Sequence, residues 1–349
     1  MKTKLPAFLL AGALASVATQ VNAQSLNPSA GYSVGQALSS YTLGAYDIYD
    51  DGGAKAYGWD STTSTLRNYD VANGGVLADY GAAPDSYADS AYISFVRQSP
   101  DGTSVWVGFS TYDGSDDRIY EVTNLDSTPT WNLKTTVSFN YDLEFDSSGN
   151  AFVIASNSIY YLDASNDYSA VLFASAGLYS ADFSFDITGN LIYGTNGLDD
   201  NVLISFANGD ITSFLADTSS WTALGVSDAT LLSSLPAGAG GLYADEFGNI
   251  YVSTTDFGTY ESLIMEWNGN TGDNENYDIL ASVYNSLGDL DGLGDLLEGG
   301  ELYDSVGWNG SGIDTLGAVP EPQTYALIAG LASLAVIAIR RRRVSTRSF

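Results

Sequence analysis

Short apolar runs along the chain are separated by a recurring polar turn. Three segments share one form, an apolar stretch, then Asp-x-x-Gly-Asn, then a second apolar or aromatic stretch, at 143–153, 183–193 and 242–252. Looser copies surround Gly53 and Gly102. An Asp that starts a tight turn and a Gly or Asn that supplies a positive φ are typical of β-hairpins. The pattern therefore predicts strands joined in pairs by hairpins.

The turn recurs along the chain at intervals of 40 to 59 residues. The aligned glycines, spaced 49, 47, 40 and 59 residues apart, are Gly53, Gly102, Gly149, Gly189 and Gly248. Each turn is followed by a further apolar strand, at 118–122, 158–162, 202–206 and 263–267, and then by a fourth, for example 171–173 or 211–215. Four strands in each ~40-residue repeat predict an all-β fold, a β-propeller of five to six four-stranded blades.

Five blades can be counted directly, and a sixth can be assembled from both ends of the body. Residues 32–43 would join part of 301–316, because mixing terminal strands removes a free sheet edge. The alternatives are a β-sandwich, which the fixed repeat disfavours, and a β-solenoid, whose period would be shorter. The long step before Gly248 predicts an insertion near 216–240. Within it, 219–235 reads as a short helix that ends at Pro236.

Composition limits the chemistry. The chain has no Cys and no His, which excludes disulfides, thiolate nucleophiles and the commonest general base and transition-metal ligand. Of its 42 acidic residues only Glu321 lies outside 24–319, where five basic residues leave a net charge of −36. Such a body repels nucleic acid and attracts cations. With 13% aromatic residues it is not a disordered acidic segment.

Both ends read as processing segments. Lys2 and Lys4 precede an apolar stretch at 7–17, and small residues lead to a cleavage site between Ala23 and Gln24. This arrangement predicts a secretory signal peptide at 1–23. The propeller domain would then occupy 24–318, followed by a tail at 319–349.

The tail has three parts in order: a Pro-Glu-Pro box, an apolar helix at about 324–339, and a basic stop. The residues of the box and the stop are Val319, Pro320, Glu321, Pro322, Arg340, Arg341, Arg342 and Arg343. The two prolines disfavour helix before the apolar run, and the arginines favour the cytoplasmic side of a membrane. An ordinary single-pass anchor and an apolar core helix are the alternative interpretations.

This tail resembles the PEP-CTERM sorting signal of exported bacterial proteins. The resemblance implies cleavage near the box by an exosortase-type membrane enzyme, with the helix as a transient anchor. It also implies a cell-surface or secreted protein, associated with exopolysaccharide or other surface proteins. The body resembles NHL, SMP-30 and YVTN propellers, in which Asp-x-x-Gly-Asn followed by a strand recurs between the first two strands of a blade. That second resemblance implies a fold and leaves the function open.

An acidic, glycine-rich loop at 286–300 holds the best metal-site candidate. Alternating acids with glycines suit Ca²⁺, which takes six to eight oxygen ligands, and the candidate ligands are Asp289, Asp291 and Asp295. The loop departs from an EF-hand at Leu293 and Gly300, where oxygen ligands belong. A plain acidic linker is the alternative, and Ca²⁺ is the only cofactor that the sequence suggests.

Other candidates are less specific. Acids in the loops between second and third strands would gather on one rim, either as a cation surface or as ordinary turn residues: Asp113, Asp116, Asp117, Asp199, Asp200 and Asp256. Trp59, Trp106 and Trp267 read as blade core, whereas Trp131 and Trp308 are candidates for sugar stacking. No catalytic motif is present. The sequence therefore favours a non-enzymatic exported propeller, with a carboxylate-dependent glycoside or lactone hydrolase and a sugar-binding module as alternatives.

Overall fold

The repeated turns have the predicted hairpin geometry. In the computed structural model, Asp146, Asp186 and Asp245 each accept, through Oδ1, the backbone N–H groups two and four residues on, and through Oδ2 the Asn side chain four residues on, all at 2.7–2.9 Å. The glycines of these turns have φ of 82°, 80° and 94°. One carboxylate therefore closes each turn, and Gly supplies the left-handed backbone that other residues rarely adopt.

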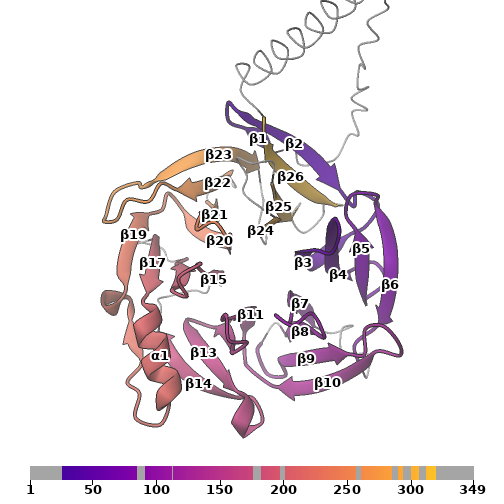
Figure 1. The fold of residues 1–349 in the computed structure, drawn as a ribbon, viewed down its shortest axis with the longest axis horizontal. Coiled ribbons are helices and arrows are strands. Elements are labelled where there is room, and N and C mark those ends of the chain that lie inside the picture. Colours follow the sequence, from indigo (N-terminus) through magenta and orange to yellow (C-terminus); the bar gives the residue numbers. More distant parts are fainter. Residues whose placement is uncertain are drawn as a thin grey trace, which may run out of the picture.

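The structure describes residues 26–319 apart from 85–90, 112, 176–181, 197–200, 257–260, 285–289, 294–299 and 306–311. Its strands form six sheets that surround a common centre (Figure 1). We number these blades in chain order. From the centre outward, blade 1 contains β3 (Leu43–Asp50), β4 (Ala54–Asp60), β5 (Thr65–Asp70) and β6 (Gly75–Gly81). Blade 2 contains β7 (Tyr92–Gln98), β8 (Val105–Ser110), β9 (Arg118–Thr123) and β10 (Thr130–Thr135).

The next two blades contain additions. Blade 3 contains β11 (Asn140–Phe145), β12 (Ala151–Ala155), β13 (Ser158–Asp163) and β14 (Ser169–Ser175), with β18 (Leu224–Gly225) parallel to its outer strand. A short 3₁₀ turn, η2 (Ala164–Asn166), joins β13 to β14. Blade 4 contains β15 (Phe183–Phe185), β16 (Leu191–Gly194), β17 (Val202–Phe206) and β19 (Thr230–Ser234).

The last two blades draw on both ends of the body. Blade 5 contains β20 (Gly238–Ala244), β21 (Ile250–Thr255), β22 (Glu261–Trp267) and β23 (Tyr277–Tyr284), with β1 (Asn27–Pro28) at its outer edge. Blade 6 contains β24 (Leu290–Leu293), β25 (Glu301–Ser305), β26 (Ile313–Ala318) and, as its outermost strand, β2 (Tyr32–Ala37). The antiparallel register of β2 with β26 runs from Tyr32 opposite Ala318 to Ala37 opposite Ile313. The fold is thus an all-β six-bladed propeller, and the predicted closure by both ends is confirmed.

The prediction for the insertion was wrong in detail. Segment 211–215, expected as a strand, lies in the helix α1 (Asn208–Ala216), and 219–235, expected as a helix, contains β18, the 3₁₀ turn η3 (Val226–Asp228) and β19. Ile211 and Phe214 are three residues apart, so a helix buries both on one face. They pack in the core between blades 3 and 4, and β19 instead completes the sheet of blade 4.

The core is divided among the blade interfaces. Each of six buried clusters joins two neighbouring blades, including the pair that closes the ring. Between blades 2 and 3, for example, Phe95 and Trp106 pack with Leu143 and Val153. Gly108 leaves the space that the Phe95 ring fills, because a Cβ there would lie 2.1 Å from the ring. Every blade is therefore held by apolar contacts on both faces. The innermost strand of each blade faces the common centre (Figure 1).

Candidate functional site: an inner ring of carboxylates

A polar position on the innermost strands recurs with the repeat. Four residues before the turn Asp stand, in blades 1 to 5, Asp47, Arg97, Asp142, Asp182 and Gly241. In blade 6 the residue four before Asp295 is Asp291. The four carboxylates of this set are buried: Asp47 and Asp142 are 7% exposed, and Asp182 and Asp291 are 4% exposed. Buried carboxylates need partners, and the neighbouring blade supplies them.

Three of these carboxylates join one blade to the next through a backbone amide. Asp291 Oδ2 accepts the N–H of Ile48 at 2.5 Å, from blade 6 to blade 1. Asp47 Oδ2 accepts the N–H of Gln98 at 2.5 Å, from blade 1 to blade 2. In each case the donor directly follows the same repeat position in the next blade.

Asp182 repeats this contact between blades 4 and 5. Its Oδ2 accepts the N–H of Leu242 at 2.8 Å, and Leu242 directly follows Gly241. Its Oδ1 accepts the N–H of Phe183 within its own blade at 2.8 Å. We call this set of contacts the inner ring. It links inner strands that are distant in sequence. The spacing of the residues alone therefore does not show which of them are partners.

Arg97 occupies the ring position of blade 2 and contacts the blades on both sides. Its Nη1 lies 3.3 Å from Asp47 Oδ1. Its Nη2 lies 3.1 Å from both Asp142 Oδ1 and Glu144 Oε1, and its Nε donates to the carbonyl of Leu143 at 3.1 Å. One guanidinium therefore faces three carboxylates, the combination that we call the Arg97 cluster.

The Arg97 cluster has perturbed acidity. Burial raises the pKa of Glu144 well above its usual value; the Arg97 charge opposes this rise, and Asp142, Asp47 and Asp291 add to it. Burial likewise raises the pKa of Asp47, against the opposing Arg97 charge and the amide hydrogen bond from Gln98. Asp142 Oδ2 is buried without a hydrogen-bond partner in the described part of the chain. Perturbed carboxyls and an unpaired oxygen mark this cluster as the candidate site.

The structure places one of the three candidate Ca²⁺ ligands. Asp291 lies on β24, where it is buried and accepts N–H groups from Ile48 and Gly292. Asp289 and Asp295 lie outside the described residues. In the sequence, Asp291 and Asp295 have the same spacing as the ring and turn acids of other blades, and the contacts of Asp291 give that residue a structural role. The Ca²⁺ site stays a prediction, and the described residues contain no group of three or more acids arranged to hold a metal ion.

The acidic loops are used locally where the structure describes them. Asp117 accepts from Ser110, from Thr111 and from the N–H of Phe139 in the next blade. Asp116 pairs with Arg118 at 2.8 Å, and Asp113 accepts from Ser115. Asp256 is exposed, and Asp199 and Asp200 lie outside the described residues. These contacts support the interpretation of the described members as turn residues.

The tryptophans that the structure describes pack in the interfaces between blades. Trp131 lies on β10, where its Nε1 donates to the Tyr80 carbonyl at 3.0 Å and its ring packs edge-on against Trp59. It therefore belongs to the interface of blades 1 and 2. Trp59 and Trp106 are buried in the core as predicted, and Trp267 packs partly buried in the core between blades 4 and 5. Trp308 lies outside the described residues.

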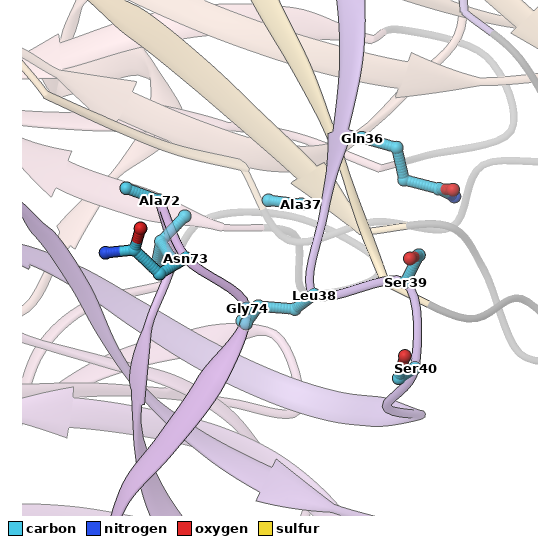
Figure 2. A pocket seen from close by; sticks show the side chains of 9 residues that line it. Gln36, Ala37, Leu38, Ser39, Ser40, Ala72, Asn73 and Gly74 are labelled. Atoms are coloured by element: carbon cyan, nitrogen blue, oxygen red, sulfur yellow. The ribbon is translucent and has the colours of Figure 1, made fainter.

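A pocket of ≈ 210 Å³ lies between blade 6 and blade 1. Figure 2 shows the end of β2 and the following Ser39 and Ser40 on one side, and the turn between β5 and β6, with Asn73 and Gly74, on the other. None of its nine lining residues is titratable: Gln36, Ala37, Leu38, Ser39, Ser40, Val71, Ala72, Asn73 and Gly74. The pocket offers hydrogen bonds without an acid or a base.

The predicted processing segments fall almost wholly outside the described chain. Ala23, Gln24, the Pro-Glu-Pro box and the four arginines are among the residues that the structure does not describe. Val319 is the exception: its N–H donates to the Gly31 carbonyl at 2.7 Å, one residue beyond β26. In the described segments no helix is both long and apolar enough to cross a membrane, and the helix predicted at about 324–339 lies beyond them.

Comparisons with known proteins support the fold. No protein family model matches the chain, and no curated protein matches its sequence. Among solved structures, the PQQ-bound aldose sugar dehydrogenase of Streptomyces coelicolor is similar with a TM-score of 0.55 and 11% identity, over 84% of this chain and 100% of that one. A luciferin-regenerating enzyme has a TM-score of 0.55 and 14% identity, over 83% and 96% of the two chains.

A third similar structure is regucalcin, a calcium-binding protein from Agrobacterium tumefaciens. Its TM-score is 0.50 at 11% identity, over 81% of this chain and 93% of that one. At such identities the likeness concerns the fold alone, which is that of a six-bladed β-propeller. Proteins with this architecture include enzymes and binding proteins, so the fold does not select between them.

Proposed function

We propose that this chain is an exported, non-enzymatic β-propeller that acts at the cell surface or in the extracellular matrix. The observation that carries the proposal is the inner ring, in which Asp47, Asp182 and Asp291 accept backbone amides of the next blade. A hydrolase that works with carboxylates needs them facing its substrate. Here they join the blades, which suits a rigid scaffold.

Export by a sorting tail is compatible with the way the ring closes. The last strand, β26, pairs with β2, and the chain leaves this seam at Val319. All strands of the six sheets lie before Pro320. Cleavage by an exosortase-type enzyme in the box at Pro320-Glu321-Pro322 would therefore leave the propeller closed. Exopolysaccharide and other surface proteins are the proposed partners, on the basis of the tail.

The sorting part of the proposal is tested by replacing Pro320, Glu321 and Pro322 with alanine in the full-length protein. We expect a longer form that stays in the membrane fraction, whereas the parent is shortened and leaves it. A matched control replaces Ser345, Thr346 and Ser348, beyond the arginines, with alanine and should be processed normally. Normal shortening of the box variant would contradict the sorting proposal, because the box would then be dispensable.

One observation favours a second candidate, a carboxylate-dependent hydrolase. Glu144 combines a raised pKa with neighbouring carboxylates, the environment in which a general acid is kept protonated. Glycoside and lactone substrates, tested at several pH values with the parent and with Glu144→Gln, separate the two candidates. Turnover that the substitution abolishes would establish the hydrolase. If the parent shows no turnover, the scaffold remains the supported function.

A further inference from the structure

The Arg97 cluster contains more negative charge than its cation balances. Asp47, Asp142 and Glu144 all lie within 3.3 Å of one guanidinium. The side chain of Arg97 is 11% exposed, and those of the acids are 10%, 9% and 17% exposed. Buried carboxylates are costly unless each has a compensating charge or donor. If all three were ionised, the cluster would carry a net charge of −2.

The three acids differ in their other contacts. Asp47 also accepts the Gln98 amide, and a hydrogen bond to the charged form favours ionisation. Asp142 and Glu144 stand two residues apart on β11, so they project to the same side of the strand. Both contact the same Arg97 nitrogen at 3.1 Å. The second oxygen of Asp142 is buried without a donor in the described chain.

We propose that the Arg97 cluster is a proton-binding switch between blades 2 and 3, in which Glu144 keeps a proton in the closed ring to a higher pH than in the unfolded chain. A protonated Glu144 has an O–H to offer, and Asp142 Oδ2, two residues away on the same strand, is a buried acceptor without a donor in the described chain. The proton makes the net charge of the cluster less negative by one. Loss of this proton as pH rises weakens the contact of blade 2 with blade 3.

The charged groups around Glu144 come from four inner strands. Arg97 on β7 is the cation; Asp142 on its own strand, Asp47 on β3 and Asp291 on β24 are acids that disfavour its ionisation. The surroundings therefore favour the protonated form from several sides, and Arg97 alone opposes it.

The direction of the stability effect follows from linkage. A carboxyl that holds its proton more tightly in the folded state than in the unfolded chain stabilises the fold below its unfolded pKa. That stabilisation is lost as pH rises toward and through the folded pKa. The switch thus predicts a propeller that loses stability as pH rises above the usual pKa of an unfolded Glu. This inference is independent of whether the chain is exported.

The test compares the propeller body, residues 24–319, with its Glu144→Gln variant. This segment contains all six sheets and the β2–β26 closure. We expect the melting temperature of the parent to fall as pH rises above the usual Glu pKa of about 4.3. The variant should fall less and should melt roughly 3 °C or more above the parent at the alkaline end of the series. Parallel curves would overturn the proposal.

A matched control and an independent measurement complete the test. Glu246, an exposed residue in the turn between β20 and β21, is replaced by Gln and should follow the parent curve. The infrared carbonyl band of a protonated carboxyl should persist in the parent above the usual Glu pKa of about 4.3 and should be reduced in Glu144→Gln. Absence of that band from the parent would overturn the proposal, even if the variant failed to fold.

Discussion

The guanidinium of Arg97 lies 3.1 Å from the carboxylate of Asp142, on the innermost strand of the next blade. The two residues occupy the same repeat position, four residues before a turn Asp, in blades 2 and 3. Elsewhere this position joins blades by a carboxylate and a backbone amide. Here a charged pair does so, and it brings Asp47 of blade 1 and Glu144 into the same contact. A single cation therefore links three blades.

Removal of this cation should destabilise the propeller strongly. Arg97→Gln leaves three carboxylates with reduced compensation in a buried site, and breaking a buried pair typically costs about 3–5 kcal/mol. The free energy of unfolding, measured by urea titration at neutral pH, checks this. Arg118→Gln is the control: its pair with Asp116 is more exposed, so its loss should cost less than about 1 kcal/mol. Equal losses would contradict a special role for Arg97.

Two glycine substitutions should change stability in opposite directions. Gly149 has φ of 82°, with nothing within 4 Å of an added Cβ, so Ala there introduces backbone strain without a clash. We expect Gly149→Ala to lower the free energy of unfolding by about 1 kcal/mol. Gly209 lies in the first turn of α1, also with free space. Ala is the better helix former, and Gly209→Ala should raise the free energy by up to about 1 kcal/mol.

The buried Asp314 should contribute to stability in acid. It lies on β26 at 3% exposure, and burial raises its pKa to about 6, against a backbone hydrogen bond from Leu26. Because the folded pKa exceeds the unfolded value, its contribution is present at low pH and is lost as pH rises through about 6. Asp314→Asn should flatten the pH dependence of the melting temperature from about pH 4 to 6.5. An unchanged profile in that range would be inconsistent with the raised pKa.

Ring closure can be tested with a cross-link, because the chain has no native Cys. Tyr32 and Ala318 are directly opposite on β2 and β26, and the adjacent Val319–Gly31 hydrogen bond places them at a non-hydrogen-bonded pair, where side chains approach closely. Cysteines at both positions should form a disulfide that closes almost the whole ring. The oxidised form should be more stable than the reduced form by up to about 5 kcal/mol. No difference between the two forms would indicate that the seam is open in solution.

The Ca²⁺ prediction has its own measurement. The melting temperature of residues 24–319 should rise with Ca²⁺ in a saturable way, and less with Mg²⁺, because a ligand that binds only the folded state stabilises it. Asp295→Asn should remove that rise. Asp291→Asn, whose amide oxygen can still accept the Ile48 N–H, should weaken the rise as well, because Asp291 is also a candidate ligand. Identical melting in Ca²⁺ and in chelator would exclude a site in this loop.

Much of the fold followed from the sequence because its signals are local. The Asp-x-x-Gly-Asn turns close on themselves through one side chain, so Asp146 and Gly149 specify a hairpin without help from the rest of the chain. Strand periodicity and repeat length then predicted blades, and the count of strands at both ends predicted the closure by β2. The helix α1 was missed because periodicity alone does not distinguish a short buried strand from a buried helix segment in a run as short as 211–215.

The candidate site depended on tertiary structure. An acid stands four residues before most turn Asp residues, a pattern that the sequence-based predictions did not use. Asp47 and Gln98 are 51 residues apart, and only the packing of neighbouring blades makes them partners. The raised pKa of Glu144 arises from burial and from charges on three other blades, which no local pattern encodes. Hairpins are determined by short-range backbone preferences, whereas the ring contacts and their acidity are determined by which strands the closed propeller brings together.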